Sequence, residues 1–116
     1  MCHVLIIEDD PLVAMSVQAL LADHGATSFD LADTEAGAIV AAREKRPAII
    51  VSDVTLRVGT GPAAVKAIHA FHGEIPVIFV TGTPEACDPV DPPGRLFAKP
   101  MHEPSVVLAF REMTAG

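Results

Sequence analysis

Five side chains able to do chemistry stand at or directly after the ends of short apolar runs in the sequence. They are three carboxylates, one hydroxyl and one ammonium, from Glu8, Asp9, Asp53, Thr81 and Lys99. If the apolar runs are parallel strands, their carboxyl ends meet at one edge of a sheet, where sites form in open α/β proteins. We therefore expect these five groups to converge.

Carboxylates that lie close together repel one another unless protons or a cation accompany them. Mg²⁺ meets that need, because it takes oxygen ligands and binds through one or two carboxylates plus phosphate oxygens. Lys99 would offset the charge of a phosphoryl group, and Thr81 would donate a hydrogen bond to one of its oxygens. The five residues therefore predict a Mg²⁺ site that stabilises a phosphoryl group in transfer by position and charge.

Apolar runs alternate with helical patterns along the chain, which is typical of a parallel sheet covered by helices on both faces. The predicted strands span residues 4–7, 27–31, 48–52, 76–80 and 96–98. Helices are predicted from Pro11 until Gly25 ends the first one, over residues 34–46 and 62–72, and after Pro100. Asp10 is expected to cap the first helix, because aspartate accepts hydrogen bonds there and proline fits the first helical position.

The apolar spacing within each helix predicts which residues face the core. The inward residues are Val13, Val17, Leu20 and Leu21 in the first helix, Ala36, Ile39 and Val40 in the second, Val65, Ile68, His69 and His72 in the third, and Val106, Phe110 and Met113 in the last. Residues 86–94 carry three prolines and no apolar period. At most one helical turn is therefore expected between the fourth and fifth strands.

Four short motifs surround the site residues in a fixed order. They are Ile-Ile-Glu-Asp-Asp-Pro at Glu8, Val-Ser-Asp-Val at Asp53, Phe-Val-Thr-Gly at Thr81 and Phe-Ala-Lys-Pro at Lys99. Together they resemble the response-regulator receiver family of two-component systems, and the resemblance covers the whole chain. It implies a single receiver domain over residues 1–116, with a flavodoxin-like, doubly wound sheet of five parallel strands in the order 2-1-3-4-5. The fourth helix of that fold is expected to be short or absent.

The resemblance also implies a metal site and a phosphoacceptor. Asp53 would accept the phosphoryl group and also bind Mg²⁺. Glu8 and Asp9 would hold the ion directly or through water, and the backbone carbonyl of Thr55 would complete the site. Such a domain is a phosphoacceptor switch and not an enzyme, although it assists its own phosphorylation and dephosphorylation.

The resemblance further implies how the switch is read and who its partners are. Thr81 would be the switch hydroxyl and Lys99 the phosphate-binding lysine, joined to Pro100 by a cis peptide bond. The phosphoryl group would come from a histidine kinase or a histidine phosphotransfer protein, and a downstream protein partner would receive the signal. Leu96 stands where the family commonly has an aromatic residue. With the proline-rich loop before it, this is similar to receivers of the bacterial general stress response.

The net charge and the lengths of the apolar runs indicate which kinds of partner are not expected. Fifteen acidic residues exceed eight basic ones, and a net charge of −7 repels a nucleic-acid backbone, so direct nucleic-acid binding is not expected. No apolar run approaches the ~20 residues that span a membrane, and the first residues lack the pattern of a signal peptide. We expect a cytoplasmic protein without membrane contact, in which Cys2 and Cys87 are free thiols.

The same residues also have ordinary structural interpretations. Acids before a helix are more often solvated caps than metal ligands, and His69 with His72 lacks a third ligand nearby. An aspartyl phosphatase would need a second acid two residues after Asp53, where Thr55 stands. The remaining alternative is a receiver-like interaction or dimerisation module that works without phosphoryl transfer. The sequence leaves open a homodimer, and also whether the chain stands alone or is part of a longer protein.

Overall fold

The computed structural model describes residues 2–82, 94–99 and 102–115 of the chain. Within these residues, five strands and four helices follow one another. They are β1 (His3–Ile7), α1 (Pro11–Ala22), β2 (Ser28–Ala32), α2 (Glu35–Glu44), β3 (Ile49–Ser52), α3 (Gly61–His72), β4 (Val77–Thr81), β5 (Gly94–Ala98) and α4 (Glu103–Thr114). No helix in these ranges is both long and apolar enough to cross a membrane.

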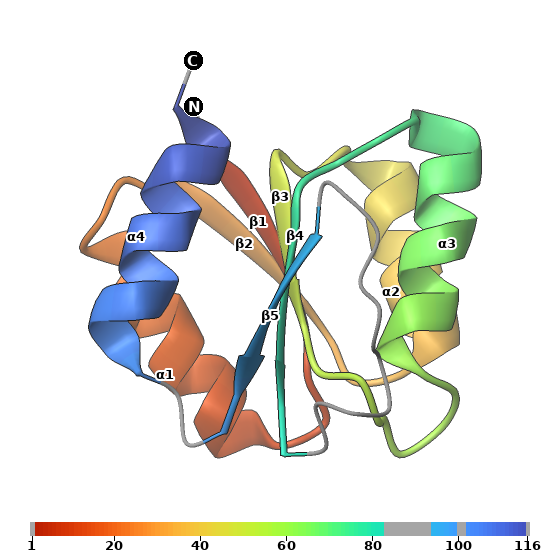
Figure 1. Ribbon diagram of the computed structural model, residues 1–116. Helices are drawn as coiled ribbons and strands as arrows, with labels where there is room; N and C mark the ends of the chain where they lie inside the picture. Colours follow the sequence, from red (N-terminus) through yellow and green to blue (C-terminus); the bar gives the residue numbers. More distant parts are fainter. Residues whose placement is uncertain (1, 83–93, 100–101, 116) are drawn as a thin grey trace.

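The strands form one parallel sheet in the order β2-β1-β3-β4-β5, which confirms the predicted doubly wound, flavodoxin-like topology. Helices α1 and α4 cover one face of the sheet, and α2 and α3 cover the other (Figure 1). Because all five strands are parallel, their carboxyl ends lie at the same edge of the sheet. That edge carries the candidate site.

Two apolar cores form, one on each face of the sheet. Neighbouring residues of a strand point to opposite faces, so Val4 and Ile6 pack beneath α1 and α4 while Leu5 and Ile7 pack beneath α2 and α3. All four side chains are almost fully buried. This double burial explains why the first apolar run shows no alternation with polar residues.

Three helices begin at side-chain caps. The N–H of Leu12 donates to Asp10 Oδ1 at 2.9 Å, which confirms the predicted cap of α1. The hydroxyls of Thr34 and Thr60 accept from the third residue beyond them, at the starts of α2 and α3. These caps set where each helix leaves the edge at which the strands end.

The predicted inner face of α2 is wrong at Ala36 and Val40, whereas Ile39 is partly buried as predicted. The residues that are buried are Ala38 and Ala42, whereas Ala36 is exposed and Val40 is 55% exposed. The helix packs against both the sheet and α3. Small alanine side chains allow that close approach, and the bulkier Val40 is left on the outside.

The inward residues of the other helices are largely as predicted. Val17, Leu21, Val65, Ile68, Val106 and Phe110 are buried, and Val13, Leu20 and Met113 are partly buried. His69 and His72 are partly buried, and their Nε2 atoms lie 3.0 and 2.7 Å from the carbonyl oxygens of Ile75 and Ala42. The predicted shortness of the helix before β5 concerns residues that lie outside the described part, apart from Gly94.

Candidate functional site

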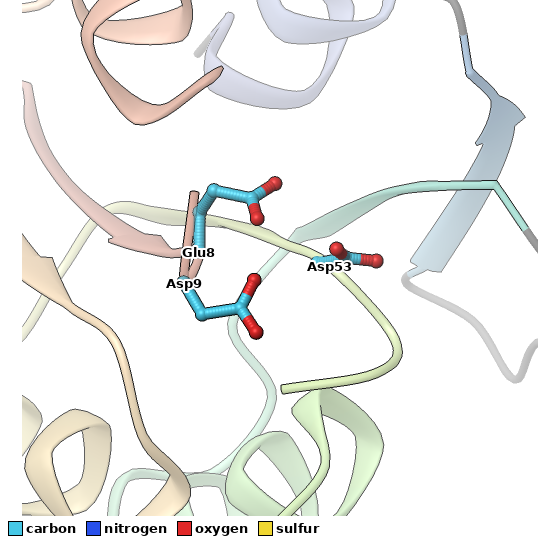
Figure 2. A group of neighbouring side chains, drawn as sticks. All are labelled: Glu8, Asp9 and Asp53. Carbon is cyan, nitrogen blue, oxygen red and sulfur yellow. The ribbon is translucent and has the colours of Figure 1, made fainter. Parts of the chain in front are cut away.

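Three carboxyl groups meet where β1 and β3 end. Glu8 and Asp9 follow β1 and Asp53 follows β3, and the two strands are neighbours with Ile7 beside Ser52. One oxygen of each carboxyl group lies within 4.8 Å of the others. Figure 2 shows Glu8 and Asp9 side by side at the end of β1, with Asp53 close to both. The predicted convergence of these acids is therefore found.

The Lys99 side chain connects two of these acids. Its Nζ lies 3.0 Å from Glu8 Oε1 and 3.0 Å from Asp53 Oδ2. The backbone N–H of Lys99 donates to the carbonyl of Thr81 at 2.8 Å, so β4 fixes the point at which the lysine leaves β5. The ammonium is thus placed against the acids by the sheet itself.

The surroundings shift the pKa values of Glu8 and Lys99. Burial of Glu8, which is 7% exposed, raises its pKa; the N–H of Asp10 and the Lys99 ammonium act in the opposite direction without cancelling the effect. Burial alone would lower the pKa of Lys99, but its hydrogen bonds and charge attraction to Glu8 and Asp53 outweigh burial and raise it. The site therefore keeps the Lys99 ammonium charged and disfavours ionisation of Glu8.

Backbone contacts hold Asp53 from its own loop. The N–H of Val54 donates to Asp53 Oδ1 at 2.7 Å, and the N–H of Gly61 donates to the carbonyl of Val54 at 2.9 Å. A Cβ on Gly61 would overlap the carbonyl oxygen of Asp53. Glycine at the first position of α3 therefore lets that helix start directly against the end of β3.

The remaining predicted site residues lie near the same strand ends or in the neighbouring loop. Thr81 is the last residue of β4, is buried, and lies beside Ala98 of β5. Thr55 is exposed in the loop after Asp53, where its backbone pairs with that of Thr60. Leu96 lies in β5 and packs, partly buried, on the core beneath α2 and α3.

Two residues with direct contacts to this loop were missed by sequence reasoning. Asp33 accepts a hydrogen bond from the exposed Arg57 side chain at 3.1 Å, and Glu35 contacts the loop backbone. Glu35 accepts a hydrogen bond from the N–H of Thr60 at 3.1 Å. In the sequence it is an acid in the first turn of a helix, which is common for its effect on the helix dipole alone. Only the fold brings it to the loop after β3.

Comparison with known proteins places this site in a family. A model of the response regulator receiver domain matches residues 4–91. The chain belongs to that family, and the four motifs that suggested it include every residue of the charged cluster at the strand ends.

Among the relatives of this chain are two PhyR proteins. The phyllosphere-induced regulator PhyR of Methylorubrum extorquens is 38% identical over 86 residues, which cover 72% of this chain and 32% of that protein. The chain thus spans about a third of the length of this relative. The solution structure of the receiver domain of PhyR from Erythrobacter litoralis superposes with a TM-score of 0.86 at 31% identity, covering 97% of this chain and 88% of that one.

A more distant structure shares the fold. The receiver domain of a sensor histidine kinase from Pseudomonas aeruginosa, described with a magnesium ion coordinated in its active site cleft, has a TM-score of 0.84 at 23% identity. It covers 99% of this chain and 98% of that one. Receiver domains are phosphoacceptor switch domains of two-component signalling, and this chain has the fold of that class.

Proposed function

We propose that this receiver domain accepts a phosphoryl group on Asp53 in a Mg²⁺-dependent manner and passes the signal on through protein contacts. The observation that carries the proposal is the meeting of Glu8, Asp9 and Asp53 within 4.8 Å, with Lys99 paired to two of them. Such a cluster has more acid than its ammonium can balance. It is therefore suited to bind a cation and a phosphoryl group together.

The donor set supports Mg²⁺ as the ion. Glu8, Asp9 and Asp53 offer hard carboxylate oxygens, and we add the carbonyl of Thr55 as a further ligand. Once bound, Mg²⁺ would neutralise part of the charge that develops on a transferring phosphoryl group. The magnesium reported in the active site cleft of the Pseudomonas aeruginosa receiver supports the same choice.

Asp53 acts as the nucleophile in this proposal. One of its carboxylate oxygens forms a bond to phosphorus while the bond between phosphorus and the donor's histidine nitrogen breaks. Lys99 already lies 3.0 Å from Asp53, so its ammonium can follow the negative charge onto the new phosphoryl oxygens. Thr81 would donate a hydrogen bond to one of those oxygens. The ends of β4 and β5 would then change together.

The partners follow from this chemistry. A histidine kinase or a histidine phosphotransfer protein would supply the phosphoryl group, and a downstream protein would recognise the changed surface near β4, β5 and α4. Phosphorylation adds about −1.5 to −2 charge at one point, which is enough to bias a two-state element. The similarity to PhyR, one structure of which is described as a stress response regulator, supports a role in a related stress regulator.

Phosphotransfer can be tested by incubating the protein with acetyl phosphate and Mg²⁺ and measuring intact mass. We expect the wild type to gain one phosphoryl group, and Asp53→Asn to gain none. Asp10→Asn is the matched control, because it changes a neighbouring acid to an amide but keeps the helix cap. It should be phosphorylated like the wild type, and chelation of Mg²⁺ should abolish the gain.

A wild type that gains no mass, and that also fails to bind beryllofluoride, would overturn the proposal. That result would favour the alternative function, a receiver-like module that works by interaction or dimerisation without phosphoryl transfer. Phosphorylation that persists in Asp53→Asn would contradict the assignment of the acceptor but leave the class of reaction intact.

A further inference from the structure

Glu35 joins the start of α2 to the loop between Asp53 and α3. Its carboxylate Oε1 accepts from the N–H of Thr60 at 3.1 Å, and its backbone N–H donates to the carbonyl of Val58 at 3.1 Å. One residue thus contacts the loop with its side chain and its main chain. These contacts join segments that are 25 positions apart in the sequence.

The loop is shaped to admit the Glu35 side chain. Gly59 has a φ of +82°, and a Cβ at that position would overlap the Cβ of Glu35. Glycine is therefore needed both for the backbone conformation and for the space. The close approach of two segments at this glycine is a second sign, besides the hydrogen bonds, that Glu35 fixes the loop.

The contact reaches the acidic cluster through the loop backbone. Thr60, which Glu35 holds, pairs with Thr55 across an isolated antiparallel bridge. In the same bridge Gly61 donates to Val54, and the N–H of Val54 donates in turn to the Asp53 carboxylate. The bridge and these hydrogen bonds thus connect Thr60 to Thr55 and to the Asp53 carboxylate.

We infer that Glu35 is a positioning residue of the phosphorylation site: it holds the loop after β3 so that Asp53 and the Thr55 carbonyl stay arranged for Mg²⁺. This inference rests on the proposed function. Glu35 acts through the loop and does not itself touch the ion or the phosphoryl group. Residues that orient metal ligands in this way can change metal affinity by about 10- to 100-fold.

Two substitutions separate positioning from charge. Glu35→Ala removes both the acceptor and the negative charge, whereas Glu35→Gln removes the charge but keeps an oxygen that can accept from Thr60. Asp33→Ala is the matched control, because it removes a nearby acid whose 3.1 Å contact with Arg57 is exposed on both sides. Exposed pairs of that kind contribute little to stability.

Magnesium affinity, measured by titration calorimetry, is the main readout. We expect Glu35→Ala to raise the Mg²⁺ dissociation constant about tenfold, and Glu35→Gln and Asp33→Ala to stay within about twofold of the wild type. Amide hydrogen exchange without Mg²⁺ is the second readout. Exchange at Thr60 should accelerate in Glu35→Ala but not in Asp33→Ala, while urea unfolding shows that every variant is folded.

Unchanged Mg²⁺ affinity in Glu35→Ala would overturn the inference and leave the proposed function standing. An equal loss in Glu35→Gln and Glu35→Ala would also overturn it, because charge and not position would then be responsible. If the wild type itself bound no Mg²⁺, the proposed function would fail, and the role of Glu35 would fail with it.

Discussion

Lys99 sets the charge balance among the individual residues of the site. Its side chain is 26% exposed, and the Glu8 and Asp53 side chains that it contacts are 5% and 11% exposed. Water screens the attraction within ion pairs at this depth less than in surface pairs, but the cost of desolvating the charges opposes it. The cluster contains three carboxyl groups and one ammonium group. Without a metal ion, the ammonium cannot balance the charge of all three carboxylates.

Glu8→Gln tests that shortage of positive charge. The folded state raises the pKa of the Glu8 carboxyl, so its ionised form is less favourable in the folded than in the unfolded chain. This cost appears as the pH rises above the ordinary glutamate value of 4.5 and grows until the pH passes the raised pKa. Without Mg²⁺, we expect the variant to be more stable than the wild type at about pH 7 and nearly equal at about pH 4.

Urea unfolding in the presence of a chelator, followed by circular dichroism, measures this difference. Excess Mg²⁺ should stabilise the wild type more than the variant, because a ligand adds more stability to the protein that binds it more tightly. The variant should then be the less stable of the two. A variant that is less stable than the wild type at neutral pH without Mg²⁺ would show that the Lys99 contact outweighs burial and repulsion.

Among the secondary-structure elements, the junction of β3 with α3 decides where Asp53 lies. The Ser52 hydroxyl donates to the Asp53 carbonyl at 2.7 Å, and α3 starts at Gly61 against the same carbonyl. The strand end, the loop and the helix start are thus packed without room for a further atom. Any change of volume there must move either the helix or the acid.

Gly61→Ala is expected to destabilise the fold by about 3 kcal/mol, since its Cβ would overlap the carbonyl of Asp53 and the hydroxyl of Ser52. Gly82→Ala is the control: a Cβ there meets no atom of the described residues within 4 Å, and the change should stay within about 1 kcal/mol of the wild type. Chemical denaturation measures both. Equal stability of the two variants would mean that the β3–α3 junction relaxes at little cost.

The sequence predicted some elements better than others, for physical reasons. Buried parallel strands are continuous apolar runs, so their number, their order along the chain and the acids at their ends could be identified before the fold was known. The inner face of α2 could not, because Ala36, Ala38, Val40 and Ala42 give apolar residues on several sides of that helix. The contact of Glu35 with Thr60 is purely tertiary and leaves no local pattern.

At the scale of the whole molecule, the two apolar cores share one sheet. In β3, Ile50 belongs to the core beneath α2 and α3, and its neighbour Val51 belongs to the core beneath α1 and α4. If the sheet were disrupted on one face, the apolar core on the other face would be exposed as well. We therefore propose that the chain unfolds as one cooperative domain.

Leu21→Ala and Ile68→Ala test this cooperativity from opposite faces. Both side chains are fully buried, and each truncation should lower the free energy of unfolding by about 3 kcal/mol while a single transition is kept. Leu12→Ala is the control, because that side chain is 73% exposed and its loss should change stability by less than about 0.5 kcal/mol. Calorimetry and circular dichroism should give the same midpoint; two separate transitions would contradict a single domain.

The Lys99 ammonium meets Glu8 across 91 positions of the sequence and Asp53 across 46. Translation proceeds from the N-terminus, so a nascent chain carries the complete acidic cluster before it carries the cation that opposes it. β5, which delivers this lysine, lies at one edge of the described sheet and, among the described strands, pairs with β4 alone. The acids that follow β1 and β3 are therefore synthesised before the strand whose lysine opposes them.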